Sequence, residues 1–140
     1  MARRKKGGQQ HIRYIVAALG VIVLVLGLAA TRKANAHHPE PRVGLTAQHV
    51  ESHEHYADYP RVAEVYEMVA QIPEVIDGLY CHCDCSKHSG HRSLLTCFQD
   101  DHGAACDVCL TEAALAFRMT REGSSLAAIR KEIDALYKRS

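Results

Sequence analysis

The longest apolar run of the chain lies near its N-terminus, over residues 14–31. These 18 residues carry no charge, and arginine flanks the run on both sides, as Arg13 and Arg32. A helix of this length would be about 27 Å long, which is enough to cross the hydrocarbon core of a bilayer. The pattern therefore predicts a transmembrane helix, or an uncleaved signal anchor, over residues 14–31.

Basic residues set the expected orientation of this helix. Residues 1–13 form a basic tail, and positive charge before a span favours the cytoplasmic side. We therefore expect a single-pass protein of the cytoplasmic membrane, with its C-terminal part outside the cytoplasm, in the periplasm or at the cell exterior. The alternative is secretion after cleavage near Ala36, because Ala34-Asn35-Ala36 has the small-x-small pattern of a cleavage site.

Polar residues dominate the next segment, over residues 32–59, which we interpret as a linker. Pro39 and Pro41 interrupt regular structure there. The segment contains five histidines, which we expect to be mostly solvated: His37, His38, His49, His53 and His55.

The predicted domain is residues 60–140, where separate segments with helical periodicity begin at Pro60 and recur toward the C-terminus. The first helix has an apolar face at Val62, Val65, Val69 and Ile72, and a further short turn ends near Gly78. Residues 80–90 have the composition of a loop, and residues 93–98 suit a short helix. A helix over residues 107–122, capped by Asp107, has an inner face of Leu110, Ala113, Ala114 and Phe117. The last helix buries Leu126, Ile129, Ile133 and Leu136.

No segment alternates as a strand does, so the expected fold class is mainly α. The N-terminal transmembrane helix and the linker would precede a small bundle of three to four short helices around a Cys/His-rich loop.

The charge of the chain is unevenly distributed. Residues 1–36 contain seven basic residues and no acidic one, which leaves ten basic against 16 acidic residues from His37 onward. An acidic domain argues against nucleic acid as a partner, because phosphates require a basic face.

Six cysteines interleaved with histidines stand out between residues 81 and 109. They begin as Cys81-x-Cys83-x-Cys85 and end as Cys106-x-x-Cys109. Thiolates bind soft ions, and the two-residue spacing recurs in zinc and iron–sulfur sites. The predicted metal ligands are Cys81, Cys83, Cys85, His91, Cys97, His102, Cys106 and Cys109. His82 either adds a ligand or points away from the cluster.

Three functions fit this pattern. The first is metal capture or handover, with Cu(I) narrowly preferred over Zn(II), because Cu(I) accepts two or three thiolates. The second is thiol–disulfide redox chemistry, and the third is an accessory subunit of a membrane complex, stabilised by disulfides. The chain carries no catalytic motif, which favours a binding protein over an enzyme. Expected partners are the membrane and a metal-donor protein, a metal-acceptor protein or a membrane complex.

A series of short motifs over residues 70–138 resembles one bacterial family. Around the three clustered cysteines the series comprises Ile72-Pro73, Leu79-Tyr80, Gly90-His91-Arg92-Ser93-Leu94-Leu95, Cys97-Phe98, His102, Cys106-Asp107-x-Cys109, Glu112-Ala113, Glu122-Gly123 and Ile129-Arg130. The family is named for its Pro-Cys-Tyr-Cys-Gly-Cys (PCYCGC) motif. Here Tyr80 replaces Pro, His82 replaces Tyr and Asp84 replaces Gly. The resemblance implies an extracytoplasmic Cys-rich domain, and it implies no reaction.

Overall fold

The computed structural model describes residues 14–16, 19–20 and 38–137. The chain divides into two compact units, residues 1–36 and residues 37–140. In the first unit, residues 14–16 and 19–20 are helical, and the rest of the expected membrane segment lies outside the described residues. Within the part of the chain that is described, no helix has the length and apolar character needed to span a bilayer.

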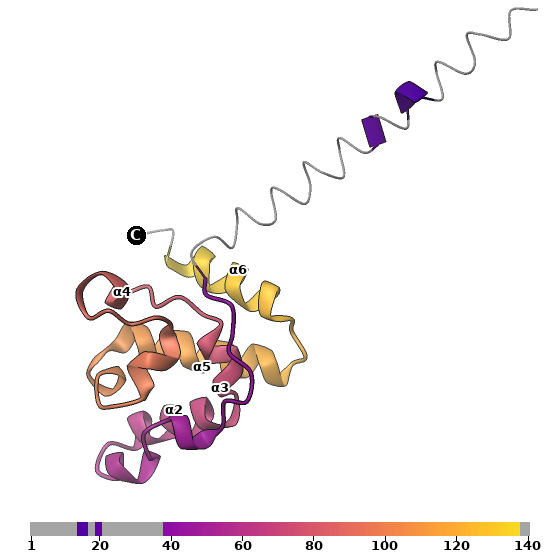
Figure 1. The fold of residues 1–140 in the computed structure, drawn as a ribbon. Helices are drawn as coiled ribbons and strands as arrows, with labels where there is room; N and C mark the ends of the chain where they lie inside the picture. Colours follow the sequence, from indigo (N-terminus) through magenta and orange to yellow (C-terminus); the bar gives the residue numbers. More distant parts are fainter. Residues whose placement is uncertain (1–13, 17–18, 21–37, 138–140) are drawn as a thin grey trace, which may run out of the picture. The chain divides into compact units, whose positions relative to one another are not determined.

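The second unit is mainly helical, as the sequence predicts (Figure 1). Its α-helices are α2 (Pro60–Gln71), α3 (Pro73–Asp77), α4 (Cys85–His88), α5 (Asp107–Arg121) and α6 (Leu126–Tyr137). Its 3-10 helices are η1 (Ala47–His49), η2 (His53–Tyr56), η3 (Leu94–Phe98) and η4 (Gly103–Ala105). Residues 38–137 contain no strand. They contain more α-helices than the three to four expected, because α4 forms inside the stretch expected to be a loop.

Proline and glycine set several helix boundaries. Pro60 and Pro73 occupy the first turns of α2 and α3. Backbone N–H groups in a first turn have no intrahelical acceptor, so proline, which lacks an N–H, costs no hydrogen bond there. Gly123 follows α5 with a φ of +81°, a left-handed conformation that glycine adopts without strain. The predicted cap of α5 is wrong by one residue, since Cys106 and not Asp107 is the N-cap.

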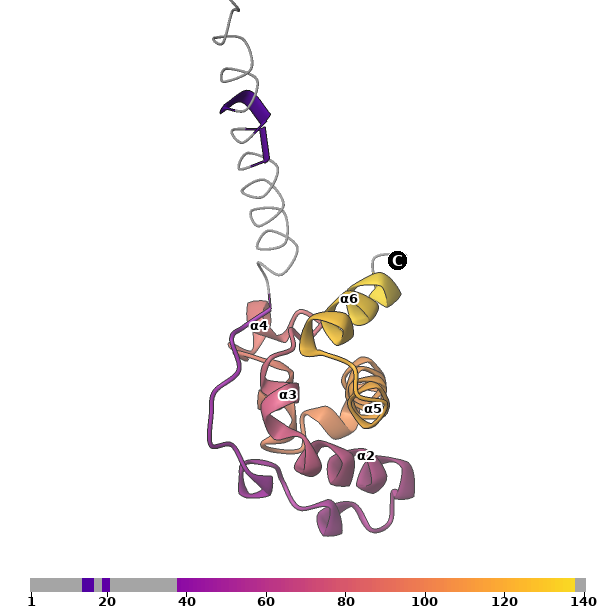
Figure 2. The same cartoon turned by 90° about the vertical axis from the view of Figure 1, so that its right-hand side faces the viewer.

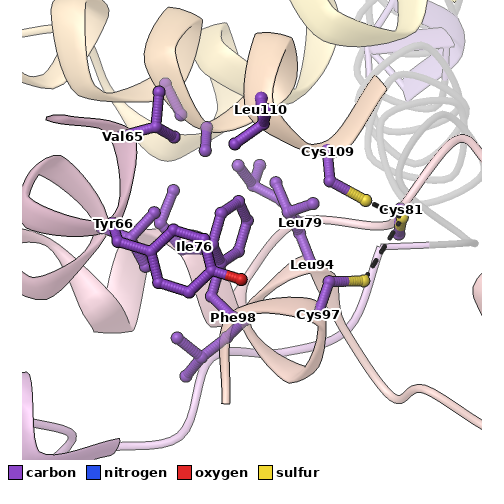
Figure 3. Packing of buried hydrophobic residues seen from close by; sticks show 14 of the residues in the cluster. Val65, Tyr66, Ile76, Leu79, Cys81, Leu94, Cys97, Phe98, Cys109 and Leu110 are labelled. Carbon is purple, nitrogen blue, oxygen red and sulfur yellow. Dashed lines mark hydrogen bonds between the residues drawn. The ribbon is translucent and has the colours of Figure 1, made fainter. Parts of the chain in front are cut away.

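The core lies among α2, α3, η3 and α5, and α5 has α2 on one side and α6 on the other (Figures 1 and 2). Tyr66, Ile76, Leu79 and Phe98 are fully buried in it (Figure 3). The Tyr66 hydroxyl donates to the carbonyl oxygen of Asp100 at 2.7 Å, which satisfies its one polar group. The same apolar cluster includes Cys81, so the cysteine loop is packed directly onto the core.

The buried faces of the last two helices differ from those expected. In α6, Leu136 is 47% exposed, whereas Arg130 and Asp134 are buried beside Ile129 and Ile133. Arg130 donates to the carbonyl oxygens of Gly78 and Pro39, and these hydrogen bonds make its burial tolerable. In α5, Ala116 is fully buried, while Ala114 and Phe117 are only partly buried. Hydrophobic periodicity locates the apolar face of a helix, but it does not identify polar residues that are buried together with their hydrogen-bond partners.

Residues 38–59, expected to belong to a linker, contact the helical domain. His38 is only 7% exposed, unlike the exposed His49, His53 and His55. Its Nδ1 accepts the backbone N–H of Tyr80 at 3.0 Å, so its Nε2 carries the proton that faces Asp134 Oδ1 at 3.0 Å. This segment is thereby attached next to the start of the cysteine loop.

Arg42 attaches residues 38–59 to the helical domain at a second point, by binding the fully buried carboxylate of Asp77 in α3. The backbone N–H and the guanidinium of Arg42 both donate to it, as do Arg92 and Ser93. Burial by itself would raise the pKa of Asp77, but these donors outweigh it and lower that pKa to about 2. Asp77 therefore stays ionised over the whole neutral range.

Candidate metal centre

A tight reversal of the chain gathers the first three cysteines. Asp84 adopts a left-handed conformation with a φ of +60°, and α4 begins at the next residue. As a result Cys83 Sγ lies 3.1 Å from Cys81 Sγ and 3.0 Å from Cys85 Sγ. Asp84 is held in this turn by the Tyr80 hydroxyl, which donates to Oδ1 at 2.6 Å, and by Lys87 Nζ at 2.8 Å from Oδ2.

Two further cysteines approach from separate elements of the core. Cys97 comes from η3 and Cys109 from the first turn of α5. Their sulfurs point toward Cys81, at 3.6 Å and 3.5 Å respectively (Figure 3). Cys106 closes the set at the start of α5, where its sulfur accepts the backbone N–H of Cys109 at 3.5 Å. We call the six thiols of residues 81, 83, 85, 97, 106 and 109 the thiol cluster.

Two histidines border the thiol cluster on one side. His91 Nδ1 lies 3.1 Å from Cys97 Sγ, and His102 Nε2 lies 3.1 Å from Cys85 Sγ. The two rings meet edge to face, with centroids 4.6 Å apart. Both side chains are partly buried, so the imidazoles lie between the buried thiols and solvent.

The eight predicted ligand residues all fall within this region, in three groups whose donor atoms lie within 4.8 Å of one another. The first group contains only buried thiols, those of Cys81, Cys85, Cys97 and Cys109. The second combines two thiols with two imidazoles, and the third has three thiols. They consist of Cys85, His91, Cys97 and His102, and of Cys83, Cys106 and Cys109.

All six cysteines are free thiols. The shortest sulfur–sulfur distance, 3.0 Å between Cys83 and Cys85, is well beyond the roughly 2.05 Å of a disulfide bond. In this form the cluster offers every sulfur as a metal donor.

Crowding of the thiols separates their acidities. Hydrogen bonds from the thiols of Cys109 and Cys97 lower the pKa of Cys81, so Cys81 ionises most readily. Its hydrogen bond and its charge in turn raise the pKa of Cys109. Burial, together with the neighbouring thiols, raises the pKa of Cys83. Ionisation of Cys83 or Cys109 beside the Cys81 thiolate is therefore disfavoured, and a nearby cation would offset this effect.

His82 takes no part in the three donor groups. Its backbone N–H donates to Glu112 Oε1 at 3.1 Å, its ring Nδ1 lies 2.5 Å from the same oxygen, and its Nε2 lies 3.2 Å from Asp134 Oδ1. The ring stacks on Tyr137. Although desolvation acts to lower the pKa of His82, the contact with Glu112 outweighs it and raises that pKa.

Glu112 is the site residue that ligand spacing does not reveal. It is fully buried on α5, one turn after Cys109, and burial raises its pKa to about 7 against the opposing effect of His82. The sequence does contain one sign of Glu112: it follows Cys109 by three residues and so lies on the same inner face of the helix, where a charged residue is unusual. Asp134 and His38 belong to the same hydrogen-bonded chain.

The comparisons with known proteins agree with the resemblance seen in the sequence. A family model described as a protein of unknown function with PCYCGC motif matches residues 46–140. No curated protein and no solved structure matches the chain.

Proposed function

Because the chain belongs to the family of proteins of unknown function with PCYCGC motif, we propose its function from the cluster itself: it binds a thiophilic metal ion. One observation carries this proposal. Four buried thiols from three separate parts of the core, residues 81–85, η3 and the start of α5, have sulfurs within 4.8 Å of one another.

Packing alone is a poor explanation for this arrangement. A buried cysteine used as a small apolar residue normally contacts carbon, whereas Cys81 contacts three other sulfurs within 3.6 Å. The two imidazoles next to the thiols add borderline donors of the kind that soft and intermediate ions accept.

Cu(I) is the ion we propose, with Zn(II) as its main competitor. The group of Cys83, Cys106 and Cys109 offers three thiols without a fourth donor, which suits three-coordinate Cu(I). The four-donor groups suit tetrahedral Zn(II) equally well. Thiol contacts as short as those between Cys83 and Cys85 also suit a redox pair, the second candidate function.

Capture and handover of the ion is the role we propose. Cys83 and Cys106 are partly exposed above the buried Cys109, so an ion can pass from thiol to thiol between the surface and the interior. The partly buried His91 and His102 offer a second route. The proposed setting is the one expected from the N-terminal sequence: a tethered domain outside the cytoplasm, which exchanges metal with a partner protein.

Mass spectrometry of the purified full-length chain tests the proposal. The protein is prepared without oxygen, offered Cu(I) or Zn(II), and weighed in native and denatured form. We expect bound metal together with six free thiols. Three disulfides and no bound metal would overturn the proposal, and reversible loss of one disulfide at a defined potential would support the redox function instead.

Two variants sharpen this experiment. Replacing both Cys81 and Cys97 by Ser removes two donors of the buried four-thiol group, so metal should be lost. Replacing the exposed His53 by Ala leaves every donor group intact and should leave metal binding unchanged, which controls for weak capture by surface histidines.

A further inference from the structure

We infer that the thiol cluster holds up to three metal ions joined by shared thiolates, with Cys85, Cys97 and Cys109 as the bridging residues. The inference rests on the proposed function, since it concerns how many ions the same donors hold and how they are connected.

The number of donors is the first argument. Six thiols and two imidazoles take part in the three donor groups, whereas a thiophilic ion takes at most about four ligands. A single ion would leave at least half of these donors without a role. With one ion in the four-thiol group, Cys83, Cys106, His91 and His102 would be left without an ion.

The overlap of the groups is the second argument. Cys85 and Cys97 belong both to the four-thiol group and to the group with the two histidines, and Cys109 belongs both to the four-thiol group and to the group with Cys83 and Cys106. A thiolate sulfur has more than one lone pair, so it can bind two ions at once. The overlap therefore orders the sites in a row, with the four-thiol site in the middle.

Direct contacts also link the donors of neighbouring groups. At one end, His102 and His91 contact the sulfurs of Cys85 and Cys97 at 3.1 Å each. From the third group, Cys83 Sγ lies 3.6 Å from Cys109 Sγ, and it lies 3.1 Å and 3.0 Å from the sulfurs of Cys81 and Cys85. In the middle, Cys81 is in contact with both Cys97 and Cys109. No donor group is separated from the next by an apolar side chain, because each shares a sulfur with it.

Charge is the third argument. If all six thiols bound metal as thiolates, they would bring six negative charges into a largely buried region. One monovalent ion would leave five negative charges uncompensated, and buried uncompensated charge is strongly unfavourable. Three ions reduce the excess to three if they are monovalent and remove it if they are divalent. A multinuclear cluster is thus the form in which all six sulfurs can bind as thiolates.

Titration of the reduced full-length chain with Cu(I), without oxygen, tests the inference. Native mass spectrometry counts the ions on each molecule, and X-ray absorption at the copper edge detects a copper–copper distance, which requires bridging sulfur. We expect species with two or three ions and a copper–copper scattering path. A maximum of one ion would overturn the inference and leave the proposed function intact, whereas no bound ion would overturn the proposed function as well.

Variants at the two ends of the row locate the outer ions. Cys106→Ser leaves two thiols in one end group, and the double variant His91→Ala/His102→Ala leaves two in the other, so each should lower the maximum count by one ion. An unchanged count in both end variants, or several ions without a copper–copper path, would overturn the bridged arrangement. His53→Ala should bind as the unaltered chain does.

Discussion

His82 and Glu112 are joined at two points: the backbone N–H and the ring Nδ1 of His82 both face Glu112 Oε1, at 3.1 Å and 2.5 Å. A buried carboxylate on α5 therefore holds the residue that separates the first two cysteines of the cluster. Since Cys109 lies on the same helix, Glu112 fixes the cysteine loop relative to a thiol from α5.

Glu112→Gln should weaken Cu(I) binding without changing the maximum number of ions. The amide keeps the size of the side chain but loses the charge that pairs with His82, so the loop becomes less well positioned. Loss of an outer partner of a metal site typically costs tenfold or more in affinity. Competition with a chromophoric Cu(I) chelator measures the change. The exposed Glu132→Gln on α6 is the matched control, and equal affinities of the two variants would contradict the positioning role.

Metal should stabilise the folded chain substantially. The donors come from residues 81–85, from η3 and from α5, and an ion bound to all of them is lost when these elements separate. At free Cu(I) a hundred times the dissociation constant, the unfolding free energy should rise by about 3 kcal/mol. Urea unfolding of reduced protein with and without Cu(I) measures this rise. A chelator should reverse it, and an unchanged urea midpoint would count against binding in the native state.

Asp84→Gly should give a more stable chain than Asp84→Ala. Both substitutions remove the carboxylate that contacts Tyr80 and Lys87, so they differ chiefly in the backbone. The φ of +60° is easy for glycine and strained for alanine, and glycine stands here in the family motif. We expect a thermal midpoint a few degrees higher for the glycine variant in the reduced, metal-free protein. Equal midpoints would show that residue 84 changes conformation at no cost.

Asp77 should make the stability of the protein sensitive to acid. Its pKa is lowered to about 2 in the folded state, against about 3.9 in the unfolded chain, so its contribution is complete above pH 4 and is lost as the pH falls toward 2. Because solvent screens the half-exposed Arg42 and Arg92, we expect about 1–2 kcal/mol.

Urea unfolding between pH 7 and pH 2 measures this contribution. Asp77→Asn should be less stable than the unaltered chain at pH 7, and its stability should fall less between pH 4 and pH 2. The exposed Asp58→Asn should follow the unaltered chain. Parallel acid profiles for the Asp77 variant and the unaltered chain would rule out Asp77 as the source of the sensitivity.

The sequence by itself determined the helical class and the residues that make up the three candidate donor groups. Apolar residues recur with helical spacing in α2, α5 and α6, and prolines and glycines mark several of the ends. The crowding of cysteine and histidine between residues 81 and 109 named all eight residues of the donor groups. These features are local, so composition and spacing are enough to recognise them.

Only the tertiary structure decided which donors meet. Cys81, Cys97 and Cys109 are far apart in sequence, and it is the packing of η3 and α5 against the core that brings their sulfurs together. The roles of His82 and Glu112 were hidden for the same reason. The buried Glu112 and the partly buried His82 satisfy each other's polar groups, and a pairing across 30 residues leaves no periodic trace along the chain.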